Sequence, residues 1–196
     1  MPASRLPAGL PAWLVAVVLA GAGPALRAQP ATATVCMACH GPGGNSAMAG
    51  VPSIAGQPRV FLENQLVLIR EGLRDVPAMQ AVMGTLGDEE IVALARHFSA
   101  LPVAAPTGPV QADRLRAGAE VSRRALCGTC HLPGYTGQNQ VPRLAGQQEA
   151  YLAVTLRMYR DKPDPGRDTA MSAALHGLKD ADLENLAHYL AQAGRP

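Results

Sequence analysis

The sequence is organised around a five-residue motif that occurs twice, as Cys36-Met37-Ala38-Cys39-His40 and as Cys127-Gly128-Thr129-Cys130-His131. Each copy has the C-x-x-C-H spacing with which haem c is attached: the cysteines form thioethers to the porphyrin and the histidine binds the iron. The two copies use all four cysteines of the chain and two of its five histidines. Because no cysteine is left over, the pattern predicts two covalently bound haem c groups.

Other uses of paired cysteines fit this sequence less well. A thioredoxin-like redox pair needs a βαβ pattern, which the sequence shows around neither motif. A zinc site would gather four cysteines, or two cysteines and two histidines, at a different spacing. Neither of these alternatives, nor a structural disulfide, explains why a histidine directly follows both pairs.

The first 28 residues have the features of a secretory signal peptide. Arg5 precedes an apolar stretch from Ala12 to Gly23, and small residues follow up to Ala28. The apolar stretch of 12 residues is shorter than the roughly 20 residues of a membrane-spanning helix. An uncleaved anchor is therefore the weaker alternative, and we expect cleavage after Ala28 and export to the periplasm.

Removal of the signal peptide leaves a polypeptide near neutrality, because it takes two arginines and no acid from 17 basic and 15 acidic side chains. The haem propionates would add negative charge, so the sequence does not support a nucleic-acid partner. The remaining charge is uneven: residues 29–105 carry a net −2 and residues 106–196 a net +2. Since nearby positive charge favours reduced iron, we predict the higher reduction potential for the second haem.

The chain after the signal peptide consists of two similar halves. The segment Val51–Gln57, VPSIAGQ, recurs as VPRLAGQ at Val141–Gln147. Between the halves, residues 101–110 contain three prolines within eight residues and are predicted to form an extended linker. We therefore expect one domain over residues 29–105 and a second over residues 106–196.

Hydrophobic periodicity predicts an all-α fold. Residues 88–100 have an acidic first turn followed by apolar side chains at helical spacing, namely Ile91, Leu94, Ala95 and Phe98. The segment that starts at Asp180 repeats this pattern with Leu183, Leu186, Ala187 and Leu190. A further helix is predicted over residues 113–126, running into the second haem motif. Domains of this size, with only two Phe and four Tyr in the chain, need the haem as part of their cores.

Another helix is predicted over residues 59–71. Val60, Asn64, Val67 and Leu68 lie near one face of it, with Phe61, Leu62 and Leu66 beside them. The stretches that follow each haem histidine are rich in Gly, Pro, Asn and Gln and lack the alternation of strands. We therefore expect loops there.

Each iron also needs a sixth ligand, for which methionine, a second histidine or an open position are the usual choices. Met79 lies seven residues before Leu86, and Met171 lies seven residues before Leu178. The two methionines therefore share a place in the repeat, and we predict that they are the axial ligands opposite the motif histidines.

Met83 and His176 are the alternative sixth ligands in the first and second halves. Neither recurs, because Met83 aligns with Leu175 and His176 aligns with Gly84. Methionine also fills irregular gaps in apolar cores, which is the alternative role for Met83. The histidines of the last helices do not recur either, so we expect them to be surface or core residues.

The combined pattern, from Cys36 to about Ala193, resembles the dihaem cytochromes c of the cytochrome c4 family. The resemblance rests on the paired haem motifs, on the repeated V-P-x-I/L-A-G-Q segment and on the methionine before an acidic-capped last helix. It implies two class I cytochrome c folds with His/Met ligation of both irons. It also implies that the proximal histidines donate hydrogen bonds to the carbonyls of Pro52 and Pro142.

Two features depart from the family pattern. The family usually has a helix before the first haem motif, and cleavage after Ala28 leaves too few residues for one. Gly87 and Lys179 replace the hydroxyl residue that often caps the last helix of each domain. These departures leave the helix ends and the exposure of the first haem open.

The resemblance implies electron transfer rather than catalysis, because six-coordinate iron offers no position to a substrate. We expect a periplasmic carrier that takes electrons from a quinol-oxidising cytochrome bc complex or a dehydrogenase and delivers them to a terminal oxidase. Any membrane association would come through these partners. The main alternative is the dihaem subunit of a dehydrogenase such as flavocytochrome c sulfide dehydrogenase. A dihaem peroxidase fits less well, because both halves supply a methionine.

Overall fold

The structure, a computed structural model, describes residues 29–162, 166 and 168–195. The predicted signal peptide, residues 1–28, lies outside these ranges. The described chain is helical, as predicted, and its β-structure is limited to one isolated bridge. Its helices are α1 (Ala33–His40), a 3₁₀ turn (Pro42–Gly44), α2 (Arg59–Arg70), α3 (Pro77–Met83), α4 (Asp88–Ser99), α5 (Ala112–Arg124), α6 (Cys127–His131), α7 (Glu149–Asp161), α8 (Thr169–Leu175) and α9 (Asp180–Gln192). None of these helices combines the length and the apolar character needed to cross a membrane.

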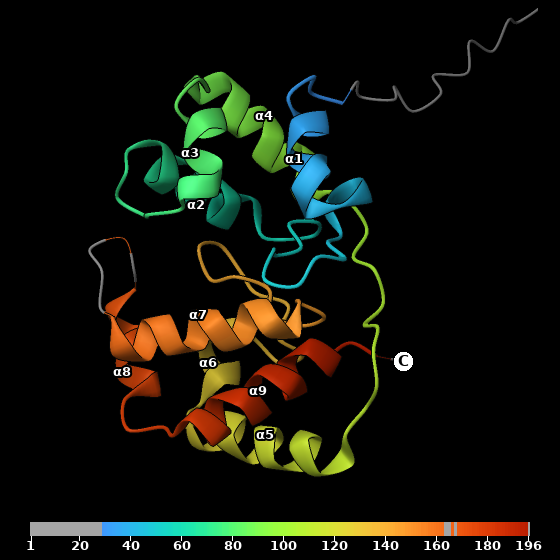
Figure 1. Ribbon diagram of the computed structural model, residues 1–196, viewed down its shortest axis with the longest axis vertical. Coiled ribbons are helices and arrows are strands. Elements are labelled where there is room, and N and C mark those ends of the chain that lie inside the picture. Colours follow the sequence, from blue (N-terminus) through green and yellow to red (C-terminus); the bar gives the residue numbers. More distant parts are fainter. Residues whose placement is uncertain (1–28, 163–165, 167, 196) are drawn as a thin grey trace, which may run out of the picture.

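The two halves of the chain are stacked along the long axis of the molecule (Figure 1). Helices α1–α4 form one end and α5–α9 the other, and the extended segment of residues 101–110 runs down one side between them. Each half has a separate hydrophobic core, and the two cores share no residue. The sequence repeat therefore corresponds to two similar helical units.

The last helix of each half contributes most of its core, as the periodicity predicted. In α4 the buried residues are Ile91, Leu94, Ala95 and Phe98, and in α9 they include Leu183, Leu186, Ala187 and Leu190. All eight side chains expose 3% or less of their surface. This spacing of three and four residues places one apolar stripe against the core and leaves the acidic first turns in solvent.

Both last helices begin without a hydroxyl cap. The backbone N–H of Gly87 donates to Oε2 of Glu90 at 3.2 Å, and the N–H of Lys179 donates to Oδ2 of Asp182 at 3.0 Å. An acid three residues into each helix thus satisfies the N–H of the cap residue, which is one half of a capping box. The missing hydroxyl residue does not prevent either helix from starting where it was predicted.

The side of α2 that faces the core is the one beside Val60 and Val67, where the sequence placed Phe61, Leu62 and Leu66. Val60 and Val67 expose 40% and 36% of their surface, whereas Leu62 and Ile69 are buried at 6% and 3%. Leu62, Leu66 and Ile69 are spaced by four and then three residues, so they form a single stripe, and all three contact the first core. The larger aliphatic side chains take the core positions, and the valines lie outside that stripe.

The helix predicted over residues 113–126 is also shorter than expected. Helix α5 ends at Arg124, and Leu126 adopts a left-handed conformation with φ 54° and ψ 32° before α6 begins. A leucine at positive φ interrupts the regular helical hydrogen bonding. The second haem motif therefore forms its own short helix, whereas the first motif lies inside the continuous helix α1.

Helices α5 and α9 cross at a glycine. A Cβ atom added to Gly118 would lie 2.1 Å from the carbonyl oxygen of Asn185 and 2.5 Å from Cβ of Tyr189. Only a residue without a side chain permits the two backbones to approach this closely. Gly118 therefore fixes the way in which α5 covers the last helix of the second half.

Candidate haem-binding sites

The two motif histidines are buried and held in the same way. His40 and His131 expose 8% and 6% of their surface. Nδ1 of His40 lies 2.7 Å from the carbonyl oxygen of Pro52, and Nδ1 of His131 lies 2.8 Å from that of Pro142. These hydrogen bonds confirm the contacts that the family resemblance implied. A carbonyl can only accept, so Nδ1 carries the proton in both rings and Nε2 keeps its lone pair for a metal.

The protonation state of these histidines also suits a metal ligand. Burial lowers the pKa of His40 and of His131, and the hydrogen bond to the proline carbonyl opposes this shift to a smaller extent. The neutral ring is therefore favoured at neutral pH. Only the neutral ring can offer a nitrogen lone pair to iron.

The four cysteines are unpaired, and each pair is divided between the core and the surface. Cys36 and Cys127 are half-buried and contact the core of their own half, whereas Cys39 and Cys130 are exposed. Burial raises the pKa of the Cys36 and Cys127 thiols. A redox-active or zinc-binding cysteine requires the opposite shift. The inner cysteine of each motif faces apolar surroundings of the kind that a porphyrin needs.

Met79 and Met171 occupy equivalent places in the two halves. Each is the third residue of a seven-residue helix, α3 or α8, and each is half-buried against the core of its own half. These short helices were not predicted, because seven residues hardly show a period. The structure thus places the two methionines as the repeat predicts, while their ligation of iron remains a prediction.

The alternative ligands lie in different surroundings. Met83 is buried at 2% exposure within the first core, and Leu175 is buried at 0% at the same position of α8. His176 is exposed and follows the end of α8. Met83 therefore fills a core position that leucine fills in the second half, and His176 lies in solvent.

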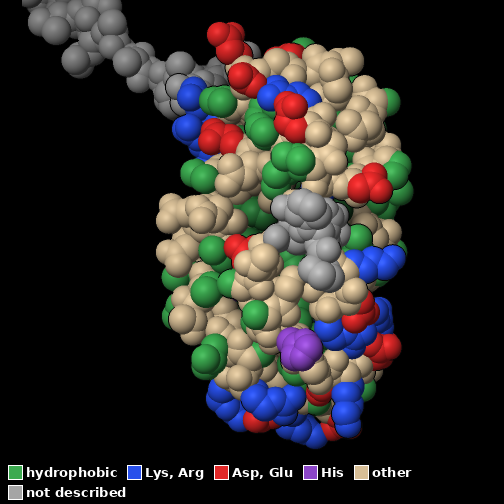
Figure 2. All heavy atoms as spheres, turned by 90° about the vertical axis from the view of Figure 1, so that its left-hand side faces the viewer, with side chains coloured by type: hydrophobic (Ala, Val, Ile, Leu, Met, Phe, Trp, Pro, Cys, Tyr) green, Lys and Arg blue, Asp and Glu red, His purple; other side chains and the backbone are tan. Residues whose placement is uncertain are grey.

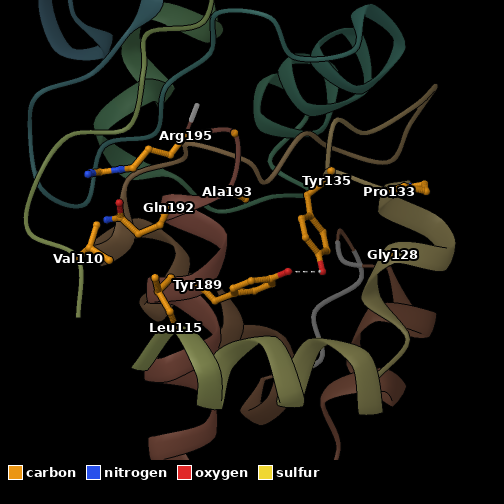
Figure 3. Close-up of a pocket in the computed structure, with 11 residues that line it drawn as sticks. Val110, Leu115, Gly128, Pro133, Tyr135, Tyr189, Gln192, Ala193 and Arg195 are labelled. Atoms are coloured by element: carbon orange, nitrogen blue, oxygen red, sulfur yellow. Dashed lines mark hydrogen bonds between the residues drawn. The ribbon is translucent and has the colours of Figure 1, made fainter. Parts of the chain in front are cut away.

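A cavity of about 500 Å³ lies beside the second haem motif. Figure 3 shows Tyr135 and Tyr189 pointing toward one another at this cavity, with their hydroxyls 3.3 Å apart. The Tyr135 hydroxyl also lies 2.8 Å from that of Ser122 on α5. His131 and Met171 do not line the cavity.

Two glutamines near the sites were missed by the sequence reasoning. Gln57 and Gln147 expose only 5% and 6% of their surface, and each binds the backbone of the other half. Both end the repeated V-P-x-I/L-A-G-Q segment. The repeat singled them out, but nothing in the sequence indicated that they reach across the molecule.

The donor set of each half fits a covalently attached haem. Each half has two unpaired cysteines, a histidine that carries its proton on Nδ1, and a half-buried methionine. The first cysteine of the motif and the methionine pack against the apolar core of their own half. Thioether attachment uses the two sulfurs, and imidazole and thioether are the ligands that His/Met-ligated c-type haem requires. The arrangement is present twice, once on each core.

Two families of known proteins match separate parts of the chain. Residues 115–194 match the family described as cytochrome c, and residues 20–97 match the family described as cytochrome c oxidase, cbb3-type, subunit III. Two cytochrome c domains bring two covalently bound c-type haems.

Curated relatives align with most of the chain. The cytochrome c4 of Pseudomonas aeruginosa is 30% identical over 178 residues, which cover 86% of this chain and 88% of that protein. A Thiomonas intermedia protein named thiosulfate dehydrogenase electron acceptor is 33% identical over 177 residues, covering 84% of this chain and 81% of that protein. Both likenesses extend across the two halves.

Solved structures share the fold. The crystal structure of reduced cytochrome c4 from Pseudomonas stutzeri has a TM-score of 0.76 and 28% identity, covering 83% of this chain and 95% of that chain. A thiosulfate dehydrogenase from Marichromatium purpuratum has a TM-score of 0.69 and 31% identity. That match covers 82% of this chain and 36% of the dehydrogenase chain, so the likeness is to a part of that enzyme.

Proposed function

The chain belongs to the cytochrome c4 family of dihaem electron-transfer cytochromes, and on this premise we propose that it carries electrons between redox proteins of the periplasm. The observation that carries the proposal is the duplicated site, in which a proximal histidine is held by a proline carbonyl and a methionine lies in the same helix position of each half. Residues 1–28 would direct export, as their composition suggests.

We assign a defined role to eight side chains. The cysteines attach the haems, and the histidine and methionine of each half are the axial ligands. The residues are Cys36, Cys39, His40 and Met79 in the first half and Cys127, Cys130, His131 and Met171 in the second. We place the boundary between the two domains, residues 29–105 and 106–196, near Ala105.

The bonds that the linker makes support this boundary. The side chain of Asn45 accepts from the N–H of Ala104 at 2.8 Å and donates to the carbonyl of Pro102 at 3.0 Å. Arg195 donates to the carbonyls of Pro106 at 3.3 Å and Gly108 at 2.9 Å. The first part of the linker is thus fastened to the first half and the second part to the second half.

These residues suit electron transfer because the histidine and the methionine of each half would together hold the haem iron. When bound, each haem supplies an iron that takes up and releases one electron. The proline carbonyl fixes the ring of the proximal histidine, and the helix that carries the methionine packs against the core. Little rearrangement then accompanies reduction, and the thioether sulfur favours Fe(II). With both ligands bound, the iron would offer no position to a substrate, and we therefore assign no catalytic residue.

Substitution of each methionine tests the ligand assignment. We expect Met79→Leu and Met171→Leu each to abolish the iron–methionine charge-transfer absorption of one haem and to let carbon monoxide bind that haem once reduced. The potential of the affected haem should fall by a fraction of the roughly 0.8 V that axial ligands span. Met83→Leu and His176→Leu are the matched controls and should leave both haems unchanged. Loss of the absorption in a control would instead assign the ligand to that residue.

The physiological donor is the finer part of the proposal. We propose a quinol-oxidising cytochrome bc complex or a dehydrogenase as the donor and a terminal oxidase as the acceptor. A thiosulfate-oxidising dehydrogenase is a second candidate donor, because relatives from Thiomonas intermedia and Stutzerimonas stutzeri, 33% and 32% identical, are named electron acceptors of such an enzyme.

Stopped-flow reduction of the purified holoprotein distinguishes these donors. A carrier of the respiratory chain should be reduced rapidly by the bc complex with quinol and reoxidised by the oxidase. Rapid reduction by a thiosulfate dehydrogenase with thiosulfate, and not by the bc complex, would favour the second candidate. Turnover of peroxide by the protein alone would contradict both.

A further inference from the structure

The two halves meet through a reciprocal pair of buried glutamines. Oε1 of Gln147 accepts from the N–H of Ser53 at 2.7 Å, and its Nε2 donates to the carbonyl of Ser53 at 2.9 Å. Gln57 repeats this with Arg143, accepting from its N–H at 2.9 Å and donating to its carbonyl at 2.9 Å. Each glutamine thus binds the backbone N–H and the carbonyl of one residue of the other half through the oxygen and the nitrogen of its amide. Four direct hydrogen bonds, related by the repeat, join the halves at this point.

These bonds fall on the peptide groups that hold the proximal histidines. The carbonyl of the Pro52–Ser53 peptide accepts from His40, and the N–H of the same peptide donates to Gln147. The carbonyl of the Pro142–Arg143 peptide likewise accepts from His131, and its N–H donates to Gln57 of the first half. A single peptide unit therefore connects each proximal histidine to a glutamine of the opposite half.

We propose that Gln57 and Gln147 are positioning residues through which each half lowers the reduction potential of the haem in the other. The proposal rests on the ligation of iron by His40 and His131 given above. A peptide whose N–H is engaged is more polarised, so its carbonyl is a stronger acceptor. A stronger bond to Nδ1–H makes the imidazole more electron-rich and a better ligand for Fe(III).

The surroundings make this connection effective. Both glutamine side chains are buried between the halves, where water competes little for the hydrogen bonds that they make with the peptide groups. The linker that joins the halves is fastened at both ends by Asn45 and Arg195. The two haem potentials therefore depend on the docking of the halves, and any partner that changes this docking would change both.

The test is the reduction potential of each haem in single variants of the holoprotein. We expect Gln147→Met to move the first haem to a more positive potential with a much smaller change at the second. Gln57→Met should do the reverse. The matched control is Gln148→Met, because Gln148 also donates across the boundary, to the carbonyl of Ser46, without touching either peptide. That control should leave the difference between the two potentials unchanged.

Two further measurements separate this role from plain packing. In the reduced protein, the Nδ1–H proton resonance of His40 should move in Gln147→Met while that of His131 stays in place. Gln147→Glu keeps the acceptor oxygen, so it should not raise the potential of the first haem, whereas Gln147→Met should raise it.

Three results would overturn the proposal. They are equal shifts of both haems in either glutamine variant, the same shift in the Gln148→Met control, and a larger effect on the haem of the glutamine's own half. If the unmodified protein carried no haem, or if its motif histidines did not bind iron, the proposed function itself would be overturned.

Discussion

The predicted haem ligands occupy equivalent positions in the two halves, whereas the side chains that pack around the last helix differ between them. Helices α4 and α9 correspond through a shared bond: Gly56 N–H donates to the carbonyl of Phe98, and Gly146 N–H to that of Leu190. This correspondence places His188, exposed by only 1%, at the position of the exposed Arg96. The same repeat position is thus a core polar residue in one half and a surface charge in the other.

The bonds of His188 explain its burial. Its Nε2 accepts from the N–H of Gln111 at 3.1 Å, so Nδ1 carries the proton and donates to Glu149 at 2.8 Å. Gln111 caps α5 and Glu149 begins α7. One neutral ring therefore joins three helices of the second half. The sequence left open whether His188 is a surface or a core residue, and the structure places it in the core.

The neighbouring position differs as well. Tyr189 of α9 and Tyr135 share a hydrogen bond and lie edge to face with ring centroids 5.6 Å apart. The first half has His97 in place of Tyr189. It has Gly44 in place of Tyr135, because the carbonyl of each accepts from the N–H groups of the I/L-A pair in the repeated segment. A Cβ on Gly44 would lie 2.9 Å from Cδ1 of Phe98. Within the described ranges, Nε2 of His97 is buried and has no hydrogen-bond partner. The repeat thus preserves the geometry of the histidines and methionines, while the packing behind them has diverged.

The largest effect that would sharpen this comparison is expected at the crossing of α5 and α9. Gly118→Val would force Cβ into the backbone of Asn185 and should destabilise the second half by about 3 kcal/mol or more. Urea unfolding of the holoprotein, followed by the iron–methionine absorption of each haem, measures the loss. The second haem should lose its methionine bond at lower urea than the first.

The control for this variant is Gly128→Ala on α6. A Cβ at Gly128 meets nothing within 4 Å, and the first motif carries Met37 at the same place. It should unfold like the original protein. Equal stability of Gly118→Val and this control would show that the helix crossing does not constrain the second half.

A smaller effect is expected from the paired substitutions His188→Ala and Arg96→Ala. Loss of the buried His188 ring leaves an unfilled space and removes the partner of the Gln111 N–H and of one Glu149 oxygen, which should cost about 2 kcal/mol. Arg96 is exposed, so its removal should change stability by less than about 0.5 kcal/mol. The same unfolding measurement applies. Similar losses in both variants would remove the distinction drawn between the two halves.

The smallest effect concerns the order of the two potentials. Lys and Arg side chains gather at the end of the molecule that the second half forms (Figure 2). Arg143 adds a positive charge beside the peptide that holds His131, where the first half has Ser53. We therefore expect the second haem to have the higher potential.

Substitution of this arginine probes that order. Arg143→Ser should lower the potential of the second haem and narrow the gap, because nearby positive charge favours Fe(II). The backbone groups that bind Gln57 remain in the variant. Arg116→Ser removes an exposed arginine paired with Asp113 and should change neither potential. Separate redox titration of the haems measures both variants, and the reverse order of potentials in the unmodified protein would refute the expectation.

Much of the fold could be predicted because periodicity and repetition are local properties of the chain. The apolar stripes of α4 and α9 were predicted residue by residue, since three- and four-residue spacing is visible along the sequence. The stripe of α2 was not, because leucines and valines occur on several of its faces and only the core selects among them. The short helices α3 and α8 were too brief to show a period.

The sequence by itself determined the chemistry of this protein. Two haem motifs and two methionines recur at matched spacing, which is the pattern that covalent attachment and the proposed ligation would require of each half. Only the tertiary structure decided which residues join the two halves. Gln57 and Gln147 bind peptides 86 and 94 residues away in the chain, and such pairs are set by the docking of two folded surfaces, which no local pattern records.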